Sequence, residues 1–337
     1  MAGDIGTQLG RAVRAGAVAV VAAAVGLAAC GDTGGASGGG GAGATFTRPI
    51  TMIIPFGPGV GSDQAGRLAS AVIEREIGVQ MPVVNVPGST GNTGMTKLLA
   101  SRPSETLATA PADTLATVVA GASSFELDEV APVCRISNAP SSLWVNTKGP
   151  YANWDELGRA ARERPGKIAV ATVGKGGIDD IMLGALAQKG FRFRAVPFAE
   201  GGERKGSVLS GDTDAIYEQA GDVRENLDNK QFKPVLQFAS ERQEGLEGEY
   251  VLSSEIGITE VIDQWRGLFA NAEMPPEELE ALSTACGKVE GSDEYEKFRE
   301  RALEQEGGYM DRTEFGAFLE SEVEKMRTLG TRYGVYE

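Results

Sequence analysis

The sequence predicts an α/β protein in which parallel sheets are flanked by helices. Two observations lead to this fold class. Short apolar runs alternate along the chain with segments of helical spacing, and four glycine-rich turns each join a predicted strand to a predicted helix. The chain after residue 45 is about 290 residues long, which is enough for two domains with cores of their own.

The predicted strands are short runs rich in Ile, Val, Leu and Ala. They cover 50–56, 82–86, 106–110, 131–137, 141–147, 167–173, 191–198, 214–218, 234–238 and 265–270. Helices are expected over 62–78, around 95–99, and over 153–166, 181–190, 275–289, 292–307 and 311–330. Asn153 stands three residues before Glu156, which is the spacing of a capping box. The last helix has one apolar stripe, which predicts core packing: Phe315, Phe318, Leu319, Val323 and Met326.

The first 45 residues read as a targeting segment rather than as part of the fold. Arg11 and Arg14 precede an apolar run of about 15 residues, which is too short for a typical membrane span but suits a secretory signal. The run ends in Leu-Ala-Ala-Cys, which resembles the lipobox of bacterial lipoproteins and implies cleavage before Cys30 and a lipid on its thiol. A plain secretion signal is the alternative. We therefore expect a signal peptide over 1–29 and a flexible Gly-rich tether over 30–45.

Charge and composition exclude several function classes. The formal net charge is −15, which argues against nucleic acid or an anionic membrane surface as a partner. The chain has no histidine, so Ser-His-Asp and Cys-His catalysis and the commonest zinc ligands are excluded. Gly57, Gly59 and Gly61 are spaced like a dinucleotide fingerprint, but Ser62 replaces its last glycine. We expect no enzyme activity, no metal and no cofactor.

The four glycine-rich turns are the most informative feature: 57–63, 87–94, 173–180 and 199–206. In open α/β sheets, ligands bind beyond the carboxyl ends of the strands, where such turns lie. Glycine lets a ligand approach backbone, and the following helix offers unpaired N–H groups to an anion. Ser62, Thr93 and Asp179 should lie near these helix N-termini, where they are either ligand contacts or simple caps.

Residues 49–69 and 83–94 together resemble the start of the Bug receptors, the substrate-binding components of tripartite tricarboxylate transporters. The positions that match the family pattern are Pro55, Phe56, Gly59, Gly61, Ser62, Asp63, Arg67, Asn85, Pro87, Gly88, Gly91, Asn92 and Gly94. Further matches follow in order at 164–177, 196–202, 209–218 and 265–282. No single motif is diagnostic, but their order over most of the chain is specific.

This resemblance implies a two-domain periplasmic-binding-protein type II fold, or Venus flytrap, with a ligand cleft between two mixed sheets. Domain 1 would cover 46–136 and 263–337, and domain 2 would cover 137–262. The first domain would bind a carboxylate through Phe56, Gly59, Val60, Gly61, Ser62 and Asp63. The second would close on it with Thr172, Gly174, Lys175, Gly176, Phe198, Gly201 and Gly202.

The implied function is an extracytoplasmic receptor, anchored to the membrane only by the lipid on Cys30. It would act as a monomer, bind a di- or tricarboxylate, an aromatic acid or an amino acid, and deliver it to integral-membrane transporter subunits. A receptor for a membrane sensor kinase is one alternative, and an envelope enzyme on the same fold is another.

Several polar residues keep two interpretations. Lys175 and Glu200 depart from the family pattern; they form either an internal salt bridge or a site for an amine-bearing ligand. Asp63 either caps its own helix or orients a ligand amine or a water. Asn92 is expected to be an N-cap, and Arg67 to pair with an acid.

The remaining residues singled out are structural. Trp144 and Trp265 are expected to pack in the core. A disulfide between Cys134 and Cys286 is compatible with an oxidising location, but sequence cannot place their Cα atoms within reach, so it stays open.

Overall fold

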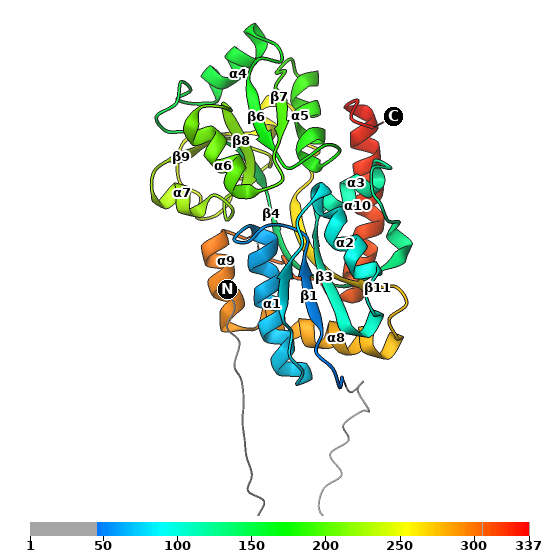
Figure 1. Ribbon diagram of the computed structural model, residues 1–337. Coiled ribbons are helices and arrows are strands. Elements are labelled where there is room, and N and C mark those ends of the chain that lie inside the picture. Colours follow the sequence, from blue (N-terminus) through cyan, green and yellow to red (C-terminus); the bar gives the residue numbers. More distant parts are fainter. Residues whose placement is uncertain (1–45, 305, 337) are drawn as a thin grey trace, which may run out of the picture. The chain divides into compact units, whose positions relative to one another are not determined.

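The computed structural model describes residues 46–304 and 306–336, so Cys30, the predicted signal peptide and the predicted tether lie outside the described residues. Within the described chain the predicted fold class is confirmed: strands and helices form two mixed sheets with helices on both faces (Figure 1). The first sheet has the strand order β2-β1-β3-β11-β4, and the second has the order β10-β9-β5-β8-β6-β7.

The first sheet combines strands from both ends of the described chain. Its strands are β1 (Thr51–Ile54), β2 (Val83–Asn85), β3 (Thr106–Pro111), β4 (Val130–Ala139) and β11 (Gln264–Asn271). β1 pairs in parallel with β2 and β3, and β11 runs antiparallel between β3 and β4. The helices packed around this sheet are α1 (Gly61–Ile77), α2 (Asn92–Leu99), α3 (Ala112–Val119), α8 (Pro276–Glu290), α9 (Asp293–Ala302) and α10 (Arg312–Arg332).

Both faces of the first sheet are covered by helices. Because successive side chains of a strand point to opposite faces, β1 contributes to a separate apolar cluster on each side. Met52 and Ile54 lie in one apolar cluster with residues of α1, α8 and α9, and Ile53 lies in another with residues of α2, α3 and α10. The second cluster also holds Trp265 and the buried stripe of α10, as the sequence predicts. A disulfide joins Cys134 of β4 to Cys286 of α8, with the two Cα atoms 6.5 Å apart.

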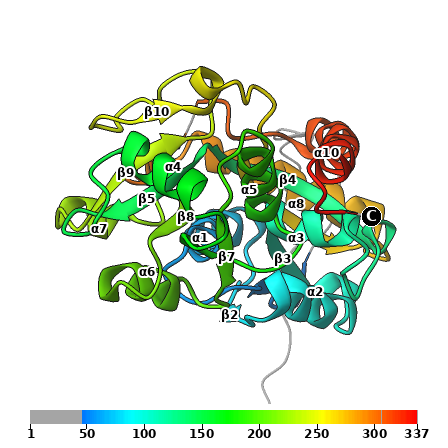
Figure 2. The ribbon, with the colours of Figure 1, turned by 90° about the horizontal axis from the view of Figure 1, so that it is seen from above.

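The second sheet is formed by the middle of the chain (Figure 2). Its strands are β5 (Ser141–Asn146), β6 (Ala169–Thr172), β7 (Arg194–Pro197), β8 (Ala215–Gln219), β9 (Phe232–Gln237) and β10 (Val251–Leu252). Its helices are α4 (Trp154–Glu163), α5 (Ile178–Gln188), α6 (Gly201–Ser210) and α7 (Arg224–Asp228). Trp144 is fully buried with residues of α6, and Leu143 lies in the cluster with residues of α4 and α5.

Most predicted elements occur, with instructive differences. The Asn153 side chain accepts a hydrogen bond from Glu156 N, which confirms the cap of α4. Asn92 is not an N-cap, because Gly91 holds that position and the Asn92 side chain instead links Ser89 O to Thr117 Oγ1. Four further elements, α3, α6, α7 and β10, have no predicted range. α6 begins inside the predicted turn 199–206, and α7 and β10 are only five and two residues long. Short 3₁₀ turns at Ser89–Gly91, Pro103–Glu105, Leu127–Glu129 and Ser253–Ile256 complete the structure.

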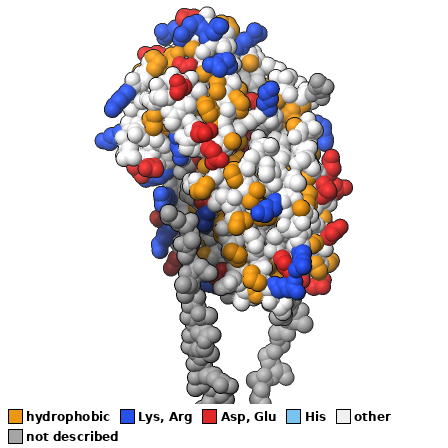
Figure 3. Space-filling view, viewed as in Figure 1, with side chains coloured by type: hydrophobic (Ala, Val, Ile, Leu, Met, Phe, Trp, Pro, Cys, Tyr) orange, Lys and Arg blue, Asp and Glu red, His pale blue; other side chains and the backbone are white. Residues whose placement is uncertain are grey.

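The surface is mixed in charge. On the face shown in Figure 3, acidic and basic side chains are interspersed and apolar ones are scattered. Leu209 is the one large apolar residue classed as exposed in the described part of the chain. No helix within 46–304 and 306–336 is long and apolar enough to span a membrane.

Candidate ligand-binding cleft

The turns that follow β1, β3, β6 and β8 converge with the first residues of β11 around a small cavity. This is the expected place for a ligand in an open α/β sheet, since the carboxyl ends of the parallel strands lie here. The cavity has a volume of about 20 Å³, which is room for roughly one water molecule. Its lining residues are Phe56, Val60, Gly61, Ser62, Pro111, Asp113, Val173, Arg204, Glu218, Gln219, Asp222, Gln264 and Arg266.

The β1–α1 turn is held by Asp63. One oxygen of this carboxylate accepts from Gly59 N at 3.0 Å, and the other accepts from Arg67 Nε and Asn85 Nδ2, each at 2.9 Å. Burial alone would raise the pKa of Asp63, but these donors outweigh it and lower the pKa. Arg67 therefore pairs with an acid, as expected, and the Asp63 carboxylate is committed to the turn. Gly59 has a φ of 82°, which favours glycine.

The amide of Gly61 donates a hydrogen bond to a residue of the second sheet's domain. Gly61 N, in the first turn of α1, donates to Asp222 Oδ1, and Arg266 Nη2 donates to Asp222 Oδ2 at 2.8 Å. The same Nη2 donates to Gln219 Oε1 at 3.0 Å. The guanidinium lies directly against Gly61, where any Cβ would collide with it. Only glycine at position 61 therefore leaves room for this arrangement.

Arg266 is 3% exposed and sits among acids. Burial opposes its charge, but the carboxylates of Asp222 and Glu304 outweigh burial and raise its pKa. Arg266 Nη1 lies 3.3 Å from Glu304 Oε1. Burial raises the pKa of Glu304 to about 7, although Arg266 opposes that rise. The cation at the centre of the cleft is therefore shared between two buried carboxylates.

Further acids line the cleft. Asp113, at the N-terminus of α3, accepts from Ile178 N at 3.0 Å and from Gln264 Nε2 at 2.6 Å. Glu218 pairs with Arg204 at 2.6 Å, both with almost fully buried side chains. Burial raises the pKa of both Asp113 and Glu218. Three acids and two arginines thus line the cavity, and the local balance is acidic.

The β6–α5 turn uses its amides differently. Val173 N donates to Asp179 Oδ2 at 2.6 Å, and Gly176 N donates to Asp180 Oδ2 at 2.8 Å. Asp179 is fully buried, and burial, followed by the nearby charge of Asp113, raises its pKa well above the ordinary value. Asp179 therefore caps its own turn. The turn also borders a separate hollow of about 380 Å³, whose lining includes Thr172, Gly174, Lys175, Gly176 and Val335.

Two glycines of the second sheet's domain lie close to loops of the first sheet's domain. A Cβ on Gly201 would lie 2.6 Å from Val60 Cγ1, and Gly174 similarly lies against the Thr90 side chain. Of the predicted site residues, Phe56, Val60, Gly61 and Ser62 line the 20 Å³ cavity. Gly59, Asp63, Phe198, Gly201 and Gly202 do not line it.

Of the two interpretations given for Lys175 and Glu200, the internal salt bridge is wrong. The two side chains form no ion pair in the described chain: Lys175 is exposed, and the Glu200 carboxylate lies against Gly57 of the β1–α1 turn. The Phe198 ring packs at the edge of an apolar cluster, and its carbonyl accepts from Arg204 Nη1 at 3.2 Å.

Sequence reasoning missed the charged residues of the cleft: Asp113, Arg204, Glu218, Asp222 and Arg266. A signal was present, since Arg266 and Glu218 are charged residues inside or at the end of otherwise apolar runs predicted to be buried strands. A charge in such a place needs a partner.

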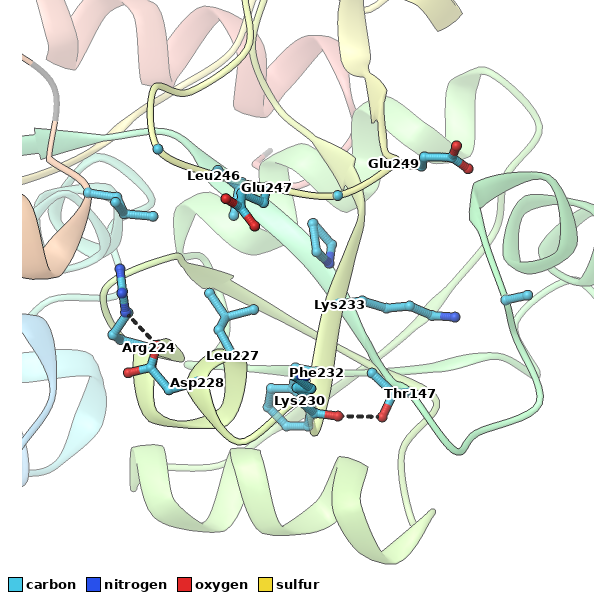
Figure 4. A pocket seen from close by; sticks show the side chains of 15 residues that line it. Thr147, Arg224, Leu227, Asp228, Lys230, Phe232, Lys233, Leu246, Glu247 and Glu249 are labelled. Atoms are coloured by element: carbon cyan, nitrogen blue, oxygen red, sulfur yellow. Dashed lines mark hydrogen bonds and ion pairs between the residues drawn. The ribbon is translucent and has the colours of Figure 1, made fainter.

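A larger hollow, which shares no lining residue with the small cavity, lies mostly on the second sheet's domain (Figure 4). It has a volume of about 640 Å³ and is bordered by α7, β9 and residues 245–249. Arg224 pairs with Asp228 on its wall, and Thr147 Oγ1 donates to Lys230 O. None of the predicted site residues lines it.

Residues 65–334 match the model of a protein family described as the tripartite tricarboxylate transporter family receptor, TctC. The chain belongs to this family. It is therefore an extracytoplasmic solute receptor and not an enzyme. Among the described residues, no group of three or more Cys, Asp or Glu side chains is arranged to hold a metal ion.

Individual proteins are similar to this chain, and the solved structures among them share its fold. The chain is 25% identical over 295 residues to the UPF0065 protein of the tcbD-tcbE intergenic region of Pseudomonas sp. strain P51, covering 85% of this chain and 87% of the relative. A solved structure described as a periplasmic transporter has a TM-score of 0.78 at 18% identity, over 87% of this chain and 99% of that one. MatC of Rhodopseudomonas palustris with bound malate has a TM-score of 0.74 at 20% identity, over 84% of this chain and 98% of that one.

Proposed function

We propose that this receptor binds a small organic acid in the cleft and delivers it to the integral-membrane subunits of a tripartite tricarboxylate-type transporter. The observation that supports this most is the way the cleft already holds a carboxylate. Gly61 N at the N-terminus of α1 and the buried guanidinium of Arg266 both donate to the Asp222 carboxylate, and helix N-termini and arginine are the usual partners of carboxylates. The fold-level likeness to a malate-bound protein is consistent with this ligand class.

The ligand also has a hydrogen-bond donor besides its carboxylate. Gln264 lines the cavity, and its Oε1 is buried and has no hydrogen-bond partner in the described chain, while its Nε2 donates to Asp113. A buried acceptor without a partner costs free energy, so a ligand that supplies a donor there gains affinity. Asp113 and Glu218 add acidic character nearby. A hydroxy acid or an amino acid fits this cleft better than a plain acid of the same length.

The two domains would close over the ligand in the manner of a hinge. We place their boundaries at 136/137 and 262/263, which the division of strands between the two sheets supports. The first domain would supply Phe56 and residues 59–63. The second would supply Thr172, residues 174–176, Phe198 and residues 201–202. A cavity of about 20 Å³ is too small for such an acid, so binding requires these loops to separate first.

The lipid anchor on Cys30 is a separate part of the proposal and rests on the lipobox-like residues 27–30. Cys30→Ala should release the protein from the membrane fraction into the soluble one, whereas the wild type stays with membranes. A wild-type protein found wholly in the soluble fraction would contradict the anchor without affecting the receptor assignment.

A thermal-shift panel tests the ligand class. Succinate, malate and aspartate share a four-carbon diacid skeleton and differ only in carrying hydrogen, hydroxyl or ammonium on C2, so they form a matched set. Citrate, adipate and benzoate extend the panel to other acids. A ligand at a thousandfold excess over its Kd adds about 4 kcal/mol to stability, which is several degrees for a protein of this size. We expect malate or aspartate to exceed succinate; a folded protein that responds to no acid would contradict the proposal.

A further inference from the structure

We infer that Asp222 occupies the ligand's carboxylate subsite, so that a ligand must displace this side chain to bind. This inference rests on the proposed function, because it names the part of the cleft that a ligand carboxylate takes. Asp222 lies in the turn after β8, in the second domain, yet the hydrogen bonds of its carboxylate go to Gly61 N and Arg266 Nη2, both in the first domain. Its side chain is 8% exposed.

The geometry around Asp222 is that of an anion site. Gly61 N, the first amide of the 17-residue helix α1, donates to one carboxylate oxygen, and the Arg266 guanidinium donates to the other. Two further groups point to a ligand. Arg266 Nε is buried and has no hydrogen-bond partner among the residues described, and the same holds for Gln264 Oε1; both residues line the cavity beside Asp222. A ligand whose carboxylate replaces that of Asp222 could hydrogen-bond to these two atoms through its other polar groups.

The cavity volume supports displacement rather than addition. A carboxylate group is larger than a water molecule, and the cavity of about 20 Å³ has room for roughly one water. A ligand carboxylate beside Asp222 would also add a further negative charge to a guanidinium that Asp222 and Glu304 already share. The ligand carboxylate therefore takes the place of the Asp222 carboxylate when the domains separate.

Asp222 thus acts as a tethered competitor. A group on the same chain has an effective concentration in the millimolar range or above, so it raises the ligand concentration needed for binding. The main chain of its turn is held by the second domain, since Asp222 N donates to Gln219 O and Asp222 O accepts from Lys205 Nζ. When the domains separate, the carboxylate leaves with that turn and exposes Gly61 N and Arg266.

The N-terminus of α5, in the second domain, receives a carboxylate from the first domain. Ile178 N, at the start of α5 in the second domain, donates to Asp113 Oδ1 of the first domain. The N-termini of α1 and α5 therefore each receive a carboxylate from the other domain. Asp222 differs from Asp113 because it is paired with an arginine, and that is why we assign the ligand carboxylate to its position.

Acetate tests the inference, because it is a free copy of the Asp222 carboxylate. The variant Asp222→Ala is heated in sodium acetate and in sodium chloride at equal ionic strength, alongside the wild type. Asp228→Ala is the matched control, since it removes the same charge from an exposed ion pair of the same domain. We expect about 100 mM acetate to raise the Tm of Asp222→Ala by about 3 °C over chloride, and to leave the wild type and Asp228→Ala within about 1 °C.

A second measurement uses the acid that gives the largest shift in the panel. Its Kd for Asp222→Ala should fall about tenfold relative to the wild type. If Asp222→Ala does not fold, Asp222→Asn keeps the side-chain size, removes the charge and should shift the Kd in the same direction. A Kd that is unchanged or higher in the variant, with no acetate effect, would overturn the inference and make Asp222 a closure contact only. That result would leave the proposed function standing, which fails only if the wild type responds to no acid.

Discussion

The turn between β1 and α1 and the turn between β6 and α5 have the same local design, but the pKa values of their aspartates shift in opposite directions. Each follows a parallel strand, contains a glycine with positive φ (82° at Gly59, 78° at Gly176), and places an aspartate in the first turn of the next helix. Asp63 accepts hydrogen bonds from an arginine and an asparagine, and its pKa is lowered. Asp179 is fully buried with other acids nearby, and its pKa is raised well above the ordinary value.

The difference shows that the motif alone does not set the chemistry of a glycine-rich turn. At the first turn, Asp63 is satisfied locally and leaves Gly61 N for a carboxylate from the other domain. At the second, Asp179 and Asp180 take amides of the turn themselves. The first turn is therefore the stronger anion site, and the second is the acidic wall opposite it.

Arg266 forms ion pairs with Asp222 of the second domain and with Glu304 of the first. Its removal should have the largest effect on stability. Arg266→Met would leave Asp222 and Glu304 buried without their cation, which typically costs about 3–5 kcal/mol. Urea unfolding of the variant against the wild type measures this loss. Arg67→Met is the matched control: its partner Asp63 keeps two other donors and Arg67 itself is half exposed, so the loss should be below about 1 kcal/mol. Equal losses in the two variants would contradict the account.

The two aspartates should respond differently to replacement by asparagine. Asp63→Asn loses charge-assisted hydrogen bonds from Arg67 and Gly59 and should cost about 2 kcal/mol at pH 7. Asp179→Asn keeps an oxygen for Val173 N and loses the acceptor for Asp180 N, but it also removes a carboxylate whose ionised form burial disfavours, so it should cost less than Asp63→Asn. Unfolding free energies at pH 7 rank the two variants. A larger loss from Asp179→Asn would break the comparison.

Stability should fall as pH rises from about 4.5 to about 7, partly because of Glu304. Burial raises the pKa of this group from about 4.5 to about 7, so the folded protein holds a proton through this range that the unfolded chain has released. The stabilisation from the protonated group is complete below pH 4.5 and is lost as pH passes through 7. Asp63 has the opposite sign, and its contribution is lost only as pH falls below about 4.

Glu304→Gln isolates this effect. The variant should show a flatter dependence of the unfolding free energy on pH between 4.5 and 7 than the wild type, measured by chemical unfolding at a series of pH values. Glu324→Gln replaces an exposed glutamate of α10 and serves as the control, with the wild-type slope retained. An unchanged slope in Glu304→Gln would mean that Glu304 is ionised in the folded protein throughout this range.

The smallest effect is expected at the turn between β7 and α6. A Cβ at Gly202 would meet no atom within 4 Å, whereas one at Gly201 would press on Val60 across the cleft. Gly202→Ala should therefore change stability by less than about 1 kcal/mol, in the stabilising direction because alanine favours helix. Gly201→Ala should be the less stable of the two in thermal unfolding. The reverse order would mean that the two loops do not meet as described.

The sequence predicts the strands, the glycine turns and the helix stripes because these depend on residues close together in the chain. The β1–α1 turn could thus be proposed as a site from residues 55–63 alone. The cleft's charged partners could not, because Gly61 and Asp222 are 161 residues apart and meet only through the packing of two domains. The disulfide stayed open for the same reason, with 152 residues between its cysteines. The sequence context of Arg266 does indicate a buried charged partner, because Arg266 is a charge within an apolar strand.

Gly61 N and Arg266 are the two groups that would receive the carboxylate of the ligand. The most direct test follows the backbone amide of Gly61 by NMR in glycine-labelled protein, while the acid that gives the largest thermal shift is titrated in. We predict that the Gly61 resonance moves and saturates with the Kd of binding, and that Gly287, in the last turn of α8, does not move. Saturable binding with an unmoved Gly61 amide would contradict the claim and place the ligand elsewhere.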